Sequence, residues 1–326
     1  MLSRLMKSAT VFLVALLAAG CVSSVLDIDG KATQPIPGKL VSEMNRKNMS
    51  ISSPILIRIF KEESELEIWK RDKSGKFALL KTYPMCRWSG KLGPKKKNGD
   101  RQAPEGFYHV SADMFNPNSQ YYLSFNLGYP NKLEAALGYT GEALMVHGAC
   151  SSSGCFALTD QGVAEIYAVA REALKGEQKS FQVQAYPFRM TTKNMARNRT
   201  DPNFSFWIDL KKGYDIFETL RRQPKVSYCG GRYVFDTDLG SNTGDPLAAC
   251  PISVPDAAST AIAGDENSLS GQTNPMHFYV DGGMHPVFRR VLTAKGEKAL
   301  SEQTSKTQVP ISKPVAALAD PHSPGD

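Results

Sequence analysis

Apolar and polar residues alternate in several short runs along the chain, a period typical of β-strands. Three such runs between residues 55 and 86 follow one another with turn residues between them, which predicts a β-meander. Gly230-Gly231, between two later runs, is typical of a hairpin turn. The predicted strands are ILIRIF (55–60), ELEIWK (65–70), FALLKTYPMC (77–86), GFYHV (106–110), SQYYLSFNLGY (119–129), SFQVQAY (180–186) and the two arms of VSYCGGRYVF (226–235).

Two segments instead repeat apolar residues with the spacing of an α-helix. In the first, Asp160 can cap the start and Gly176 lies just past the end. In the second, Asp201 is the expected cap and Pro202 the first helical residue. The whole pattern predicts a mainly β fold with two α-helices. The apolar stripes are Val163, Ile166, Tyr167, Ala170 and Leu174 in the first helix, and Trp207, Leu210, Tyr214 and Phe217 in the second.

The pattern also divides the chain into five segments. Residues 1–20 indicate a signal peptide, because basic residues precede an apolar run that is too short to span a membrane. Residues 21–50 are polar and are expected to be a tether, while the strands and helices fill one domain over residues 51–236. Residues 237–300 form a C-terminal extension for which the sequence predicts no structure. Residues 301–326 are rich in proline and are expected to be disordered.

Cys21 determines whether the mature protein would be anchored to a membrane. It follows the small residues Ala18, Ala19 and Gly20, where a bacterial lipoprotein is cleaved and lipidated. The same residues also fit ordinary cleavage that releases a soluble periplasmic protein, so both outcomes stay open. We expect a periplasmic protein that is lipid-anchored to the outer membrane through Cys21 and touches the membrane only through that anchor.

Composition and charge limit the possible partners. The chain is 41% hydrophobic and 22% charged, which argues against wholesale disorder. Its net charge of +7 is too small to indicate a nucleic-acid-binding protein, so we expect no nucleic acid partner. The charge is most concentrated in RWSGKLGPKKKNGDR (87–101), which has six basic residues and one acidic residue. This stretch predicts either a solvated loop or a collar that attracts a carboxylate-bearing substrate.

The chain has six cysteines, and in an exported protein this number indicates disulfides. If Cys21 carries lipid, five remain, and an odd number leaves at least one free thiol or an intermolecular bond. Four pairing cysteines allow three connectivities, and the sequence does not choose among them. The candidates for pairing are Cys86, Cys150, Cys229 and Cys250.

The stretch LMVHGACSSSGCFALTD (144–160) holds the strongest candidate chemistry. Cys155 is a candidate nucleophile and His147 its base, because a nearby histidine can take the proton from an attacking thiol. Gly148 and Gly154 permit sharp turns, so the loop between them could bring imidazole and thiol together. Gly154 also permits close approach of the backbone to a bound carbonyl, whose oxyanion backbone N–H groups could stabilise.

Three other interpretations of the same stretch stay open. His147, Cys150 and Cys155 could bind a metal ion, although a further CxxC-type pair of ligands is missing. Cys150 and Cys155 could form a disulfide that closes a tight loop. Cys155 could also be an ordinary buried cysteine in a core strand.

A resemblance favours the nucleophile. Ser152, Ser153, Gly154 and Cys155, with His147-Gly148 upstream, resemble the catalytic motif of the L,D-transpeptidase (YkuD-type) family. The fuller match is to the YafK-like branch of that family and covers about residues 50–236. The segments that carry it are IRIFKEESELEIW, YPMCRWSGKLGPK, GDRQAPEGFYHV, YYLSFNLGYPN, MVHGACSSSGCFALTD, AYPFRMT and FWIDLKKGYDIFE, in that order.

The resemblance implies a catalytic domain built as a β-barrel or sandwich, with the cysteine at the mouth of a groove. Cys155 would attack the carbonyl of a diaminopimelate residue in a peptidoglycan stem peptide and form a thioester, with His147 as base and then acid. The backbone at Ser153 and Gly154 would hold the oxyanion. An amine acceptor would give transpeptidation, whereas water would give hydrolysis, including release of a peptidoglycan-linked outer-membrane lipoprotein. No metal or cofactor is implied.

The motif departs from the broader family at two positions. Ser153 stands where a histidine is usual, and Ala157 stands where arginine or asparagine is usual. These features leave open whether the enzyme cross-links or hydrolyses.

Other residues carry weaker predictions. Arg189 could bind a substrate carboxylate or make a structural ion pair, and Ser152 could contact substrate. Three histidines could lie near the site or simply be surface or packed residues; they are His109, His277 and His285. The alternative from another class of protein is a lipid-anchored wall-binding module that holds stem peptides without reacting with them.

Overall fold

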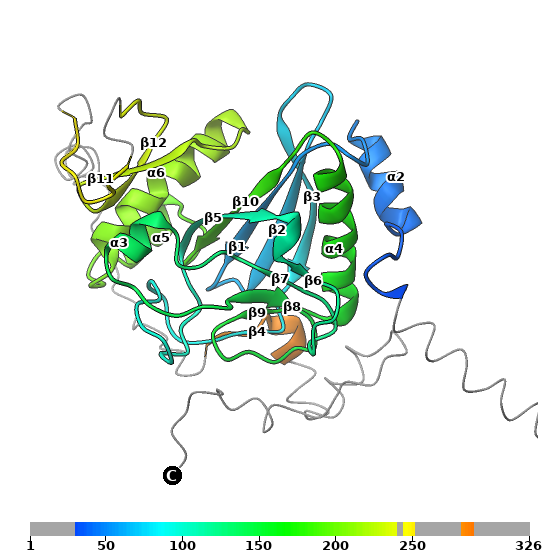
Figure 1. The fold of residues 1–326 in the computed structure, drawn as a ribbon, viewed down its shortest axis with the longest axis horizontal. Coiled ribbons are helices and arrows are strands. Elements are labelled where there is room, and N and C mark those ends of the chain that lie inside the picture. Colours follow the sequence, from blue (N-terminus) through cyan, green and yellow to red (C-terminus); the bar gives the residue numbers. More distant parts are fainter. Residues whose placement is uncertain (1–29, 240–243, 252–281, 290–326) are drawn as a thin grey trace, which may run out of the picture.

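The computed structural model describes residues 30–239, 244–251 and 282–289. The expected signal peptide, Cys21, the tail 301–326 and most of the extension 237–300 lie outside these residues. Two five-stranded sheets form the body of the domain (Figure 1). The fold is therefore mixed α/β, with the two sheets at its centre and helices packed on them.

The first sheet contains the predicted meander. Its strand order is β3-β2-β1-β10-β5, and only the β1–β10 pair among these is parallel. The expected strands 55–60, 65–70, 106–110 and 180–186 are confirmed within one residue at each end. The bounds are β1 (Ile55–Phe60), β2 (Glu65–Arg71), β3 (Phe77–Pro84), β5 (Gly106–Ser111) and β10 (Ser180–Tyr186).

The second sheet is made of strands only two or three residues long. Its order is β4-β9-β8-β7-β6, with β8 and β9 parallel. The aromatic stretch 119–129 contributes only the short strand β7, so the long strand expected there was wrong. The bounds are β4 (Arg87–Trp88), β6 (Phe115–Asn116), β7 (Ser124–Asn126), β8 (Met145–His147) and β9 (Phe156–Ala157), and a 3₁₀ turn, η1 (Ala112–Met114), precedes β6.

Strand β1 lies at the centre of the molecule and is buried on both faces. Ile57 and its alternate neighbours pack into the core shared with the second sheet and helix α4 (Asp160–Lys175). Phe60 points to the opposite face, where α6 (Phe204–Leu220) and the hairpin β11 (Val226–Cys229)–β12 (Arg232–Phe235) form a second core. Figure 1 shows α4 and α6 at opposite sides of this sheet.

Both predicted long helices are confirmed, but each is capped by a different residue from the one expected. The N-cap of α4 is Thr159, whose side chain accepts from the Gly162 N–H, while Asp160 is the first helical residue. The N-cap of α6 is Asn203, and the Asp201 carboxylate accepts from the Asn203 N–H instead. Thr159 makes a capping hydrogen bond, whereas the Asn203 side chain makes none, and Pro202 lies ahead of the helix, which begins at Phe204.

The described residues also form shorter helices that were not predicted. They are α2 (Gly38–Arg46), α3 (Lys132–Ala136) and α5 (Thr192–Arg197). Helix α2 falls inside the expected tether of residues 21–50, yet Leu40 and Met44 are buried in the main core. Since this helix packs on the domain, the packed part of the chain begins ahead of residue 51.

Residues 282–289 of the expected extension pack on the second sheet. Gly283 forms an isolated antiparallel bridge with Trp88 of β4, and Phe288 packs against Cys86. This segment therefore adds to the edge of the sheet that carries the candidate site. None of the helices in the described ranges is long and apolar enough to cross a membrane.

Candidate active site

The parallel pair β8–β9 positions the two candidate catalytic residues. Val146 pairs with Phe156, and His147 pairs with Ala157. Cys155 directly precedes β9, and Val146 and Phe156 fill the main core. Because side chains alternate along a strand and paired residues share a face, His147 and Cys155 turn to the other side of the sheet. The sheet thus presents the two candidate catalytic side chains on one face.

The described cysteines divide into two disulfides and one free thiol. Cys86 is bonded to Cys150 and Cys229 to Cys250, which leaves Cys155 free. Cys150 is therefore unavailable to Cys155, and the Cys150–Cys155 disulfide was wrong. The metal interpretation that used Cys150 as a ligand was wrong for the same reason, and no metal-binding cluster occurs in the described ranges.

The His147 imidazole is buried and held by a hydrogen bond to its own neighbour. Nδ1 lies 2.7 Å from the Gly148 carbonyl oxygen, so Nδ1 must carry the proton and donate it. Burial lowers the pKa of His147 to about 4, although the bond to Gly148 opposes the shift. The ring is consequently neutral at neutral pH, with its lone pair on Nε2 available to accept a proton.

The Cys155 thiol is half-buried and also neutral at rest. Its Sγ accepts a hydrogen bond from the Met145 N–H at 3.4 Å. Burial raises the pKa of Cys155, and the Met145 bond and the positive charge of Lys95 only partly oppose this. Within the described part of the chain, Sγ makes no hydrogen bond to the His147 ring. The resting pair is therefore a neutral thiol and a neutral imidazole.

Tyr121 is a site residue that the sequence analysis missed. Its ring lies 4.5 Å from the His147 ring, centroid to centroid. Burial raises the pKa of Tyr121, and the negative charge of an ionised Cys155 adds to the shift. The Tyr121 carbonyl oxygen accepts from the Gly148 N–H at 3.0 Å. Tyr121 therefore contacts the base and lies within electrostatic reach of the nucleophile.

Two glycines shape the loop between base and nucleophile. A Cβ on Gly148 would lie 2.5 Å from Asp160 Oδ1 and 2.9 Å from the Tyr121 carbonyl oxygen, so no side chain fits there. Gly154 has φ +124°, a backbone conformation that side chains rarely adopt. The Asp160 carboxylate accepts from the Ala149 N–H at 2.8 Å and fixes the start of the loop.

Ser152 and Ser153 lie on the outer part of the same loop. Ser152 Oγ donates to the Cys155 carbonyl oxygen at 2.7 Å and lies 2.7 Å from Ser89 Oγ. Ser152 thus ties the nucleophile to the segment after β4. Ser153 is exposed. Contact of Ser152 with substrate, and the oxyanion role of Ser153 and Gly154, stay predictions.

Arg189 takes part in a structural ion-pair network. Its guanidinium lies 2.5 Å from Glu65 and 2.7 Å from Glu67, both on β2, and stacks over the Phe60 ring at 4.3 Å. These contacts match the structural ion pair that was one of the two alternatives for Arg189. Binding of substrate by Arg189 stays a prediction.

The other histidines lie on several elements. His109 is exposed on β5, and His285 lies 3.8 Å from Glu65. His277 lies outside the described residues.

Comparison with known proteins identifies the class of enzyme to which this site belongs. A sequence model of the YkuD L,D-transpeptidase catalytic domain matches residues 54–183. The chain belongs to the L,D-transpeptidase family, whose cysteine enzymes remodel peptidoglycan. Within that family it is 43% identical over 211 residues to the putative L,D-transpeptidase YafK of Escherichia coli K12 and of Escherichia coli O157:H7, a match that covers 65% of this chain and 85% of YafK.

Solved structures give a more distant match. The helical cell shape determining protein Pgp2 of Campylobacter jejuni is 21% identical, with a TM-score of 0.34, over 58% of this chain and 79% of Pgp2. A mutant form of the same protein is 20% identical, with a TM-score of 0.35, over 61% of this chain and 81% of that chain.

Proposed function

We propose that Cys155 attacks the carbonyl of a diaminopimelate residue in a peptidoglycan stem peptide and forms a thioester. The observation that carries the proposal is the placement of Cys155. It is the free thiol among the described cysteines, and it shares a sheet face with His147. A module that only held stem peptides would have no need for a half-buried thiol beside a neutral imidazole.

The first half of the reaction transfers one proton and breaks one amide bond. As Sγ bonds to the carbonyl carbon, Nε2 of His147 takes the thiol proton, since Nδ1 is already protonated toward Gly148. Backbone N–H groups around Gly154 stabilise the oxyanion. The imidazolium then gives its proton to the leaving amine, and the thioester remains on Cys155. The imidazole–thiol contact tightens when substrate binds, as catalytic hydrogen bonds often do.

The second half restores the thiol by attack of water or an amine on the thioester. We propose that water competes strongly here, so that the enzyme hydrolyses as well as cross-links. Ser153 is exposed and the loop from 148 to 154 carries only small side chains besides the disulfide-bonded Cys150, so it forms a poor lid over Cys155. One product of such hydrolysis would be an outer-membrane lipoprotein released from the wall.

The proposed reaction takes place in the periplasm, with the protein anchored to the outer membrane through lipidated Cys21. The disulfides Cys86–Cys150 and Cys229–Cys250 support an extracytoplasmic site, because such bonds persist in oxidising compartments.

Mass spectrometry of wall fragments tests the proposal. The purified protein is incubated with sacculi that carry bound lipoprotein and, separately, with free tetrapeptide stems. Release of lipoprotein supports hydrolysis, and diaminopimelate–diaminopimelate dimers without release would contradict it. No change in either substrate would contradict the enzyme assignment. Cys155→Ala is the inactive control.

A further inference from the structure

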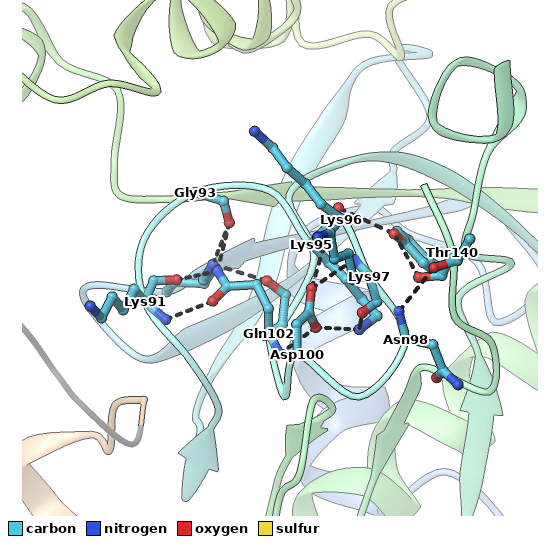
Figure 2. A network of polar contacts seen from close by, with 12 residues as sticks. Lys91, Gly93, Lys95, Lys96, Lys97, Asn98, Asp100, Gln102 and Thr140 are labelled. Atoms are coloured by element: carbon cyan, nitrogen blue, oxygen red, sulfur yellow. Dashed lines mark hydrogen bonds and ion pairs between the residues drawn. The ribbon is translucent and has the colours of Figure 1, made fainter. Parts of the chain in front are cut away.

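The segment 91–101, which we call the basic loop, is fixed by hydrogen bonds and an ion pair among its own residues. It contains five basic residues and one acidic residue, Asp100. The Asp100 carboxylate accepts from the backbone N–H groups of Lys96 and Lys97 at 3.0 and 2.9 Å. It also accepts from the Gln102 N–H at 3.0 Å and forms an ion pair with the buried Lys95 ammonium. Figure 2 shows these contacts converging on Asp100.

A buried ion pair fixes the base of the basic loop. Lys61 and Glu105 are both fully buried, and Lys61 Nζ lies 2.8 Å from Glu105 Oε1. Lys61 also donates to the carbonyl oxygens of Gly93 and Ala103, while Glu105 accepts from the Gly93 N–H at 2.7 Å. Both ends of the loop are therefore tied to one charge pair in the core.

Three cations of the basic loop remain exposed on its surface. Lys96, Lys97 and Arg101 point into solvent, and none of the described carboxylates forms an ion pair with them. In Figure 2 the Lys96 side chain extends away from the network, and its ammonium lies 6.0 Å from the Tyr139 ring centroid. The Asp100 carboxylate binds Lys95 and three backbone N–H groups, and it forms no ion pair with these three exposed cations.

The residues that flank the basic loop lie close to Cys155, and the positive charge of Lys95 within it acts on the Cys155 thiol. Ser89, just before it, contacts Ser152, and a Cβ on Gly154 would lie 4.0 Å from the Gln102 carbonyl oxygen. On its other side the loop is bonded to Thr140: the Thr140 N–H donates to the Lys96 carbonyl oxygen, and Thr140 Oγ1 accepts from the Asn98 N–H. Ala143, three residues beyond Thr140, places its carbonyl oxygen 4.0 Å from the Cys155 Sγ.

We propose that the exposed cations of the basic loop, Lys96, Lys97 and Arg101, bind the free carboxylate groups of the stem peptide whose carbonyl Cys155 attacks. This proposal rests on the proposed function and adds to it the group that selects the substrate. A rigid loop holds its charges in place before binding, so the loop itself loses less conformational entropy when an anionic peptide binds than a flexible lysine-rich segment would. The cations also steer an anionic peptide toward the thiol.

The test compares two stem peptides: one with its free carboxylate groups, and one in which the same groups are replaced by primary amides. The wild-type protein should turn over the carboxylate peptide with the higher kcat/KM. The triple variant Lys96→Gln, Lys97→Gln, Arg101→Gln should lose about 10-fold in kcat/KM on the carboxylate peptide, mainly through KM, because exposed charges each contribute weakly. Its kcat/KM on the amide peptide should be unchanged.

A matched triple variant controls for net charge. Lys73→Gln, Lys179→Gln, Lys193→Gln removes three other exposed lysines, on other elements, for which no ion pair is found in the described structure. It should keep the carboxylate preference, and both triple variants should match the wild-type melting temperature.

Three outcomes would overturn the basic loop proposal. One is equal loss on both peptides, and the second is equal loss in both triple variants. The third is an unchanged carboxylate preference combined with lost binding to vesicles of anionic phospholipid, which would show that the loop binds a membrane surface.

A separate measurement distinguishes failure of the proposed function from failure of the basic loop proposal. If the wild-type protein turns over neither peptide, the function is wrong, but calorimetric binding of the two peptides to Cys155→Ala still tests the basic loop. Tighter binding of the carboxylate peptide, lost in the triple variant on the same background, supports the proposal, and equal binding overturns it.

Discussion

Raising the pH from 6 to 8 should speed the alkylation of Cys155 by iodoacetamide about 100-fold, since only the thiolate reacts. The reason lies in the resting state of the pair. Burial lowers the pKa of His147 to about 4 and raises that of Cys155 above its usual range. A neutral imidazole does not stabilise a thiolate as an imidazolium would, so the thiol should titrate by itself.

The magnitude follows from the fraction of thiolate. A thiol with an ordinary pKa near 8.5 is about 3% ionised at pH 7, and burial holds Cys155 below that fraction. Far below its pKa, the thiolate fraction rises tenfold per pH unit. His147→Ala should therefore leave alkylation nearly unchanged, whereas turnover should fall about 10²–10⁴-fold, because the base acts in the transition state.

The assay is peptide mass spectrometry of the Cys155-containing fragment after timed labelling at a series of pH values. Fragmentation should place the label on Cys155 alone and leave Cys86 and Cys150 unlabelled, which confirms that the disulfide is intact. A rate that is flat between pH 5.5 and 8, and that is lost in His147→Ala, would refute the reasoning. It would show a preformed thiolate–imidazolium pair.

Three further variants test how the loop between His147 and Cys155 is built. Gly148→Ala should destabilise the fold by about 1–3 kcal/mol in chemical denaturation, because its Cβ would clash with Asp160 and the Tyr121 carbonyl oxygen; an unchanged midpoint would contradict this. Cys86→Ser with Cys150→Ser should cost about 2–4 kcal/mol while Cys155 still reacts with iodoacetamide; loss of that reaction would tie the disulfide to the chemistry. Burial raises the pKa of Asp160 to about 6, so the stability that this carboxyl contributes is full below about pH 4 and is lost as the pH rises through 6. Asp160→Asn should therefore stabilise the protein at pH 7.5 by about 1–2 kcal/mol and have little effect at pH 4, whereas a pH-independent change would be inconsistent with a buried charge.

The sequence predicted those strands and helices in which apolar residues repeat with a regular spacing over many residues. Strand β1 and helix α4 each bury a continuous apolar pattern, so their existence follows from spacing alone. Strands β8 and β9 have three and two residues, too few for any period, and they form because they pair with each other across the sheet. Helix α2 has only Leu40 and Met44 buried, a signal too sparse to distinguish from a tether.

The candidate site shows the same division. Cys155 and His147 could be proposed as a pair because their residue types and the glycines around them occur within one short stretch, and the pairing of β8 with β9 places them on one face of the sheet. Tyr121 could not be identified, since only the pairing of β7 with β8 brings its segment to His147. For Arg189 the sequence left two roles open, substrate binding and a structural ion pair. The carboxylates that pair with it, Glu65 and Glu67, lie on β2, far from Arg189 in the sequence, so the sequence alone could not choose.

The connectivity of the disulfides sets a requirement on the order in which the exported chain folds. From residue 86 onward the cysteines emerge as Cys86, Cys150, Cys155, Cys229 and Cys250, and the two bonds join the first with the second and the fourth with the fifth. An oxidant that joined each new cysteine to the last free one would couple Cys155 to Cys229 and destroy the nucleophile. The strands of both five-stranded sheets, however, are complete at Tyr186, before Cys229 emerges. If the chain is exported from its N-terminus, both sheets can therefore form, with Cys86 and Cys150 already joined, before Cys229 and Cys250 follow, and this order would keep Cys155 from pairing with either of them.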